Sequence, residues 1–169
     1  MNVNLDEITI RPIRLNDNEQ LEKVIRTAMT EFNADPLTTI IGDPKLRTMY
    51  QNFQKSNAAY FIVDVSGKIM GGCGVAALDG SDENICELQR MFLAREVRGN
   101  GIGKKLLELC VETAKKYNYT KMYLETLSDM HAAIRLYRSS GFVMQPNPAG
   151  NTGHSGCNIY MLLDLKKEL

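Results

Sequence analysis

The segment from Arg98 to Lys104 reads Arg-Gly-Asn-Gly-Ile-Gly-Lys and has the clearest chemical meaning in the sequence. Glycine allows a backbone to turn sharply and brings its N–H groups close to a ligand. An apolar pattern of helical period begins directly afterwards, and a helix N-terminus carries about half a positive charge. Lysines in the first turn oppose that charge unless an anion binds there. The segment is therefore predicted to bind a diphosphate through main-chain N–H groups, rather than to be a plain turn before a helix.

Two common phosphate motifs do not fit this spacing. A P-loop needs a glycine where Arg98 stands and a serine or threonine where Lys105 stands. A dinucleotide-binding fingerprint needs its third glycine at a position occupied here by Lys104 or Leu106. The anion-binding turn is therefore of another kind.

Two polar residues interrupt an apolar strand pattern in the segment 84–93. One face of that strand is expected to carry Ile85, Glu87, Gln89, Met91 and Leu93. A polar pair buried next to a cleft indicates function, whereas a carboxylate on an exposed sheet edge would only be solvated. We take Glu87 as the first candidate for a general base, and Glu125, on the next predicted strand, as the second.

Alternating strands and helices are predicted around these residues. We predict strands at 7–15, 58–65, 68–78, 84–93, 120–127, 141–144 and 157–165, and helices at 16–32, 46–53, 101–117 and 129–140. Ser66-Gly67 is typical of a tight hairpin, and the glycines at 71, 72 and 74 predict a bend or bulge. The order predicts a mixed α/β sheet in a single domain over residues 1–169.

The bulk composition restricts the class of partner. Lys+Arg and Asp+Glu are equal at 20 each, so no global field favours a nucleic acid or an anionic membrane. The N-terminus lacks the pattern of a signal peptide, and no apolar stretch is long enough to cross a bilayer. Cys73, Cys86, Cys110 and Cys157 are scattered, without zinc-ligand spacing. We expect a cytoplasmic protein without disulfides or a structural metal.

Two longer segments resemble the GNAT N-acetyltransferase superfamily. They are LQRMFLAREVRGNGIGKKLLE (88–108) and YLETLSDMHAAIRLYRSSGF (123–142). The first contains R-x-x-G-x-G, similar to the acetyl-CoA pyrophosphate loop of that family, and the second contains A-I-x-L-Y-x-x-x-G-F, similar to its second signature helix. The resemblance implies mostly antiparallel N-terminal strands, splayed central strands and flanking helices. In that family an asparagine often opens the second signature. Met130 stands at this position here, so a cofactor contact made by the asparagine side chain is not carried over.

The resemblance also implies the binding residues for acetyl-CoA. The backbone of Met91, Phe92 and Leu93 would contact the acetyl and pantetheine groups. Arg98, Gly99, Asn100, Gly101, Ile102, Gly103 and Lys104 would surround the pyrophosphate. No metal is implied.

The resemblance implies fewer catalytic residues than cofactor-binding residues. Tyr137 would protonate the departing thiolate, unless it only packs its helix on the sheet. His154 and Cys157 would lie near the acceptor pocket, where His154 is a base, a substrate contact or a solvated loop residue. A Cys/His hydrolase is the weaker interpretation, because no third orienting group is evident.

The implied activity is transfer of acetyl from acetyl-CoA to a primary amine of a small molecule or peptide, by direct attack in a ternary complex. Two alternatives remain at this point: transfer of a longer acyl group, and a CoA-binding sensor or assembly module without turnover. The resemblance also implies a homodimer, with the last strand as the contact that many relatives use.

Overall fold

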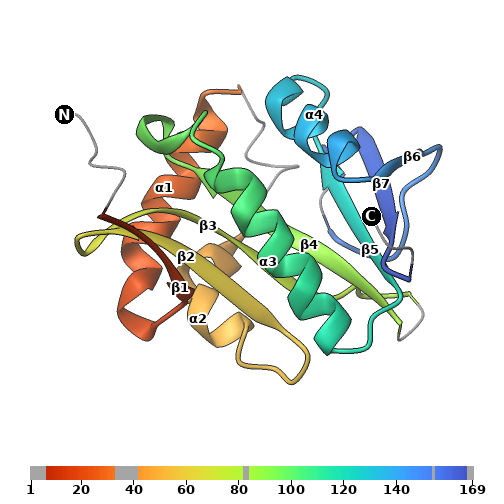
Figure 1. The fold of residues 1–169 in the computed structure, drawn as a ribbon, viewed down its shortest axis with the longest axis horizontal. Coiled ribbons are helices and arrows are strands. Elements are labelled where there is room, and N and C mark those ends of the chain that lie inside the picture. Colours follow the sequence, from red (N-terminus) through yellow and green to blue (C-terminus); the bar gives the residue numbers. More distant parts are fainter. Residues whose placement is uncertain (1–6, 33–41, 82–83, 154, 167–169) are drawn as a thin grey trace.

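The computed structural model describes residues 7–32, 42–81, 84–153 and 155–166. Within this part of the chain, seven strands form one sheet in the order β1-β2-β3-β4-β5-β7-β6 (Figure 1). The strands are β1 (Ile8–Pro12), β2 (Ala59–Val65), β3 (Lys68–Ala77), β4 (Ile85–Leu93), β5 (Lys121–Thr126), β6 (Val143–Gln145) and β7 (Ile159–Asp164). The helices are α1 (Asn18–Thr30), α2 (Met49–Asn52), α3 (Ile102–Lys116) and α4 (His131–Ser139). The predicted mixed α/β fold is confirmed: β4 and β5 are parallel, and the other neighbours are antiparallel.

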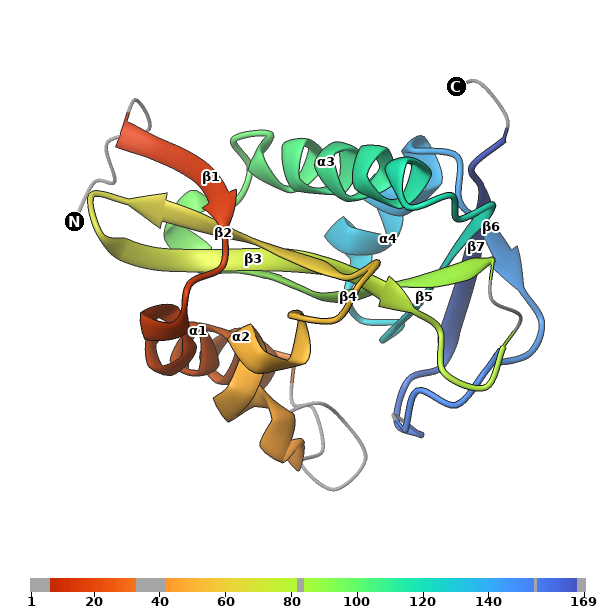
Figure 2. The same cartoon turned by 90° about the horizontal axis from the view of Figure 1, so that it is seen from below.

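Helices cover both faces of the sheet (Figure 2). The core between the sheet and α3 and α4 includes Leu106, Cys110 and Tyr137. The core on the opposite face, beneath α1 and α2, includes Leu21, Ile25 and Met49. The helical spacing of these apolar residues places each set on one side of its helix, so burial holds the helices against the sheet.

The predicted distortion of β3 is confirmed. The pairing register of β3 shifts twice, once against β2 and once against β4 between Gly72 and Gly74. Gly71 has φ of 138°, and a Cβ on it would collide with the carbonyl oxygen of Phe92. Only glycine permits this close approach of the two strands.

Two predicted element boundaries are wrong. The first strand ends at Pro12, not Leu15; Leu15 starts a 3₁₀ turn and is 56% exposed. The predicted helix at 46–53 is divided into a 3₁₀ turn, Pro44–Thr48, and the single turn of α2. Proline at the start of that turn fixes the backbone, and the Asp43 side chain accepts from Lys45 N–H at 2.8 Å.

The last strand is not an edge of the sheet. β7 is hydrogen-bonded to β5 along Ile159–Asp164 and to β6 along Tyr160–Leu162. The two edges of the sheet are β1 and β6, and a homodimer contact through the last strand stays a prediction. In the described residues, no helix has the length and apolar character that a membrane crossing demands.

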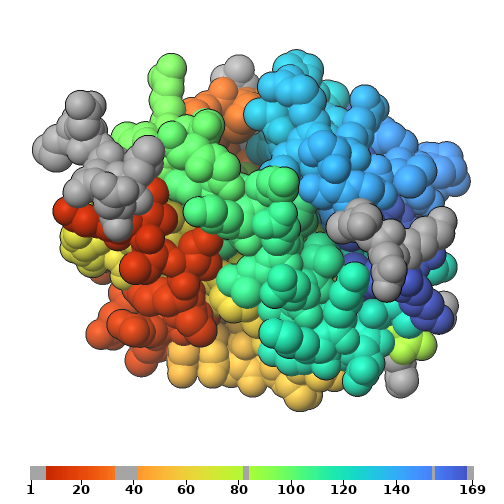
Figure 3. Space-filling model, in the orientation of Figure 1, coloured from red at the N-terminus to blue at the C-terminus, as the bar shows by residue number. Residues whose placement is uncertain are grey.

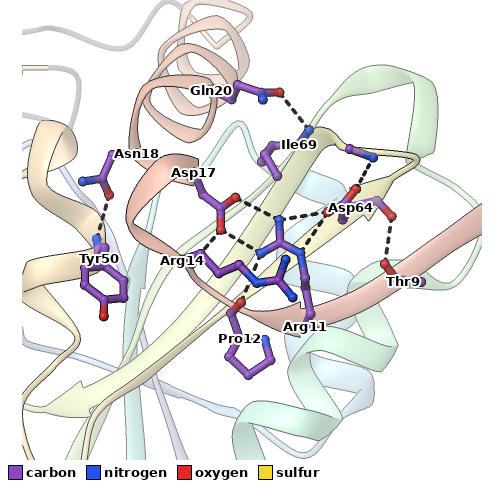
Figure 4. Close-up of polar contacts among 11 residues, drawn as sticks. Thr9, Arg11, Pro12, Arg14, Asp17, Asn18, Gln20, Tyr50, Asp64 and Ile69 are labelled. Atoms are coloured by element: carbon purple, nitrogen blue, oxygen red, sulfur yellow. Dashed lines mark hydrogen bonds and ion pairs between the residues drawn. The ribbon is translucent and has the colours of Figure 1, made fainter.

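A half-buried arginine, Arg11, joins the edge strand β1 to β2 and to the start of α1 (Figure 4). Two Arg11 nitrogens contact the Asp17 carboxylate at 2.7 and 2.8 Å, and Arg11 Nε donates to Asp64 at 2.9 Å. Burial raises the pKa of Asp17, but hydrogen bonds from Arg11 and from the Arg14 N–H outweigh it, so the net pKa is lowered. This cluster fixes the position of α1 on the sheet.

We predict that Asp17→Asn lowers the free energy of unfolding at about pH 7 by about 2 kcal/mol, because Arg11 keeps Asp64 but loses the buried Asp17 carboxylate, one of its two charged partners. A carboxyl pKa that is lowered on folding contributes its full stabilisation above the unfolded-state pKa of about 4, and this stabilisation is lost progressively as the pH falls through the lower folded-state pKa. The difference from wild type should therefore shrink as the pH falls towards about 3. Urea unfolding of both proteins at about pH 7 and about pH 3 measures this difference in the free energy of unfolding.

Thr9→Ala is the matched control, since Thr9 only donates an exposed bond to the Asp64 carbonyl. Its effect should stay within about 0.5 kcal/mol. An Asp17→Asn protein as stable as wild type at neutral pH would contradict the role assigned to the cluster.

Candidate active site

The central strands separate in the middle of the sheet. The parallel pairing of β4 with β5 covers only Ile85–Glu87 against Lys121–Tyr123, although β4 continues to Leu93 and β5 to Thr126. Beyond this point β4 is paired with β3 alone, and β5 with β7 alone. The splayed strands expected from the family resemblance are therefore present, and the β4 backbone is unpaired on its β5 side.

A β-bulge in β4 follows the point of separation. Gly72 and Gly74 are two residues apart in β3, but their partners Phe92 and Gln89 are three apart in β4, so β4 holds one extra residue. The bulge includes Arg90, whose φ of 52° is left-handed. A bulge reverses the alternation of side chains beyond it.

One consequence corrects the sequence analysis. Met91 and Leu93 pack in the core beneath α3 and α4, and Phe92 packs on the opposite face. Because Leu88 also lies in the α3 and α4 core, Glu87 and Gln89 point to the other face. The prediction that one face carries Glu87, Gln89, Met91 and Leu93 is therefore wrong beyond the bulge.

A cleft of about 260 Å³ passes through the region where the strands separate. Its walls come from both faces of the sheet: Ala133 and Tyr137 from α4 on one side, and Asn52 from α2 on the other. Glu87 and Glu125 also line it. The two carboxylates named from the sequence thus share a cavity that reaches both sides of the sheet.

Glu87 is buried, with 8% of its surface exposed. Gln89 Nε2 donates to Glu87 Oε2 at 2.6 Å. Burial raises the pKa of Glu87 to about 7, the charge of Glu125 adds to the rise, and the bond from Gln89 opposes it. A carboxylate with a pKa near neutrality can accept and release a proton under physiological conditions.

Glu125 is held by two hydroxyl groups. Tyr123 and Thr152 each donate to it at 2.8 Å, and the Ala149 N–H donates to the Tyr123 hydroxyl at 3.0 Å. Both donors to Glu125 come from sites that the sequence analysis did not single out. With its two oxygens engaged in this way, Glu125 fits a positioning role better than that of a mobile base.

The C-terminal loop contributes one further residue to the cleft. Burial, with the charges of Glu125 and Glu87, raises the pKa of the Cys157 thiol to about 12, so the thiol stays protonated. Cys157 lines the cleft, as expected of a pocket residue, and a protonated thiol gives no support to a Cys/His hydrolase. His154, the other residue proposed from this loop, lies outside the described residues.

Tyr137 faces the cleft from α4 and is 5% exposed. Its hydroxyl lies 3.7 Å from Met91 Sδ, and its ring packs against Phe142 at a centroid distance of 5.8 Å. Burial raises the pKa of Tyr137, which keeps the hydroxyl protonated and able to donate. The residue therefore combines the packing role with a position from which it can donate into the cleft.

The glycine-rich segment forms an open turn at the start of α3. Gly99 and Gly101 have φ of 79° and 75°, and no described atom lies within 4 Å of a Cβ built on either. The N–H groups in the first turn of a helix have no intrahelical partner. Gly101, the N-cap of α3, has no side chain that could accept from them. Ile102 is buried in the core, and only its backbone is available to a ligand. The turn therefore fits a diphosphate bound by main-chain groups.

The start of α3 adjoins the cleft. A Cβ on Gly103 would lie 3.4 Å from Met91 Cε and from Leu136 Cδ2. Figure 3 shows α3, in green, beside α4, in light blue, on this face of the molecule. An extended ligand could therefore run from the turn, along the unpaired edge of β4, into the cleft.

The charged side chains of the turn are engaged elsewhere. Arg98 Nε donates to the Leu93 carbonyl at 2.9 Å, and its Nη1 pairs with Glu31 at 2.6 Å. Lys104 is exposed and lies 3.8 Å from Glu108, while Asn100 donates to the Arg98 carbonyl. In this structure Arg98 anchors the end of β4 to α1. The main-chain N–H groups of the turn remain available to a ligand.

The sequence analysis missed Arg90, which lines the cleft with 8% of its side-chain surface exposed. It pairs with Asp43 at 2.8 Å. An arginine in the middle of a strand of mostly apolar residues was the available signal.

Comparison with known proteins gives the same assignment as the geometry. The model of the acetyltransferase (GNAT) family matches residues 26–142. The uncharacterized N-acetyltransferase YjgM of Escherichia coli is 37% identical over 158 residues, which cover 92% of this chain and 94% of YjgM. A GNAT acetyltransferase from Staphylococcus aureus superposes with a TM-score of 0.83 at 26% identity, over 94% of this chain and 99% of its own.

A third relative was solved with a ligand. YncA of Salmonella typhimurium, in complex with its cofactor acetyl-CoA, superposes with a TM-score of 0.75 at 21% identity over 96% of both chains. At that identity the likeness shows the fold alone. Since the family model covers well over half of the chain, this protein belongs to the GNAT family of acetyltransferases.

Proposed function

We propose that this protein transfers acetyl from acetyl-CoA to a primary amine of a small molecule or peptide, by direct attack in a ternary complex, with residues 1–169 acting as one domain. The observation that carries the proposal is the cleft between β4 and β5, which brings Glu87, Met91 and Tyr137 to one cavity. Donor and acceptor can approach this cavity from opposite faces of the sheet. Direct transfer then requires no covalent intermediate with the protein.

Main-chain groups would hold the donor. The open N–H groups at Gly99–Gly103 suit the diphosphate, and the unpaired backbone of Met91–Leu93 can pair with the pantetheine arm as an added strand. When bound, acetyl-CoA supplies an activated acetyl group as a thioester. An N–H of the same strand would stabilise the charge that develops on the acetyl oxygen during attack. The acetyl-CoA bound by YncA supports this choice of donor.

Glu87 and Tyr137 would move the protons. A primary amine with a pKa of roughly 10.4 arrives mostly as an ammonium ion, so a base must remove a proton before attack. Glu87, with a pKa of about 7, suits that role, directly or through water. The Tyr137 hydroxyl would donate a proton to the departing thiolate on the other side of the reacting carbon.

We predict that Gly103→Glu weakens acetyl-CoA binding at least about 100-fold, because its carboxylate would face the diphosphate. A glutamate in the first turn favours the helix dipole, so α3 should still form. In the matched control Gly103→Ala, the new Cβ would make ordinary contacts at 3.4 Å, and binding should remain. Isothermal titration with acetyl-CoA distinguishes the two. Equal affinity in both variants would refute the loop assignment.

The general base is tested by turnover. A thiol-release screen over amines first finds an acceptor, and kcat is then measured against pH with both substrates saturating. Because the deprotonated form of Glu87 is the base, wild-type kcat should rise through about pH 7. Glu87→Gln should lose this inflection and about 100-fold in kcat. An inflection that persists in the variant would exclude Glu87, and acetyl-CoA binding without thiol release from any amine would favour a sensor.

We expect Tyr137→Phe to lower kcat by about tenfold or more while acetyl-CoA affinity stays near wild type. Phenylalanine keeps the ring contact with Phe142 and removes only the donor. Steady-state kinetics and titration calorimetry on the same sample give both values. Wild-type turnover would leave Tyr137 with a packing role only.

A further inference from the structure

Arg90 carries a buried donor without an acceptor. Its Nε–H has no hydrogen-bond partner among the described residues, and 8% of the side chain is exposed. The other guanidinium nitrogens are engaged: Nη2 lies 2.8 Å from Asp43 Oδ2, and Nη1 donates to Gln89 Oε1 at 3.1 Å. A buried charged donor left unpaired costs free energy. An anionic ligand group that accepts from Nε would remove that cost.

The backbone holds Arg90 in a conformation that arginine seldom adopts. Its φ of 52° lies in the left-handed region, and the buried Tyr60 hydroxyl donates to its carbonyl oxygen at 2.8 Å. Such strain persists only where the surroundings impose it, and it concentrates at functional sites. Together the bulge and the Tyr60 bond hold Arg90 at the wall of the cleft.

The polar groups of the cleft have an acidic end and a basic end. Gln89 bridges them: its Nε2 donates to Glu87, and its Oε1 accepts from Arg90. Lys45 also lines the cleft, and its backbone N–H donates to Asp43. With Arg90 and Lys45 against the single carboxylate of Asp43, this end carries a net positive charge. A small molecule with an ammonium group at one end and an anionic group at the other complements this arrangement.

We infer that the acceptor is a small amino acid with a free carboxylate close to its amine, and that Arg90 Nε binds this carboxylate while the amine lies at Glu87. This inference rests on the proposed function and narrows its acceptor. The basic and acidic ends are joined through the single side chain of Gln89. An extended peptide gains about 3.5 Å per residue, so the N-terminal amine and C-terminal carboxylate of a peptide of several residues are too far apart to occupy both.

The binding test uses reaction products, so it does not depend on turnover. The protein saturated with CoA is titrated with N-acetylalanine and N-acetylalaninamide, and with the same pair for the other common amino acids. For at least one amino acid, the carboxylate should bind at least about tenfold more tightly than its amide, the effect expected for one charge-assisted hydrogen bond. Equal affinity within every pair would overturn the inference.

Two variants keep the test interpretable. Arg90→Gln combined with Asp43→Asn removes the guanidinium without leaving Asp43 as an unpaired carboxylate, and it should abolish the preference for the carboxylate. Asp43→Asn alone is the control: asparagine can still cap Lys45 N–H, and the preference should remain. A double variant that folds, by circular dichroism, and retains the preference would also overturn the inference.

Turnover separates this inference from the proposed function. Thiol release from acetyl-CoA is compared for free amino acids and their amides. Release that is equally fast for both in wild type would leave the transferase intact and refute the carboxylate site. The carboxylate preference in binding, without release from any amine, would leave the site intact and refute the transferase.

Discussion

The β4 bulge and the end of β4–β5 pairing after Glu87 and Tyr123 determine the geometry of the site. A continuous parallel pair would fill the middle of the sheet with hydrogen bonds and side chains. Here the strands separate, and β3 follows the bulge because Gly71 permits a backbone approach that any side chain would block. The cleft, its walls from both faces of the sheet and the β4 backbone left unpaired on the β5 side all result from this separation.

The separation also sets the electrostatics. The Glu87 carboxylate, which would be solvated at a sheet edge, is instead buried, and burial raises its pKa to about 7. Arg90 lines the same cleft wall, and the Nε–H of its guanidinium has no acceptor among the described residues. Burial thus brings the pKa of Glu87 into the range that a general base needs. It also makes an anionic acceptor for the unpaired Arg90 Nε–H favourable.

The parts of this account that follow local rules were predictable from the sequence. The period of α3, the hairpin at Ser66-Gly67 and the glycine turn each depend on neighbouring residues, and the family resemblance added the splayed strands. The faces of Met91 and Leu93 were predicted wrongly, because strand alternation carries no sign of one extra residue at Arg90. The bond from Thr152 to Glu125 was also beyond reach, since the two residues are 27 apart in the sequence.

Amide hydrogen exchange across Leu88–Leu93, with and without acetyl-CoA, tests the central claim most directly. If the donor pairs with the open edge of β4, exchange in this segment should slow clearly on binding, together with exchange in the turn at Gly99–Gly103. The β6–β7 pair, whose residues do not line the cleft, should change little. Saturation with acetyl-CoA that leaves the β4 amides exchanging at their original rate would contradict the account.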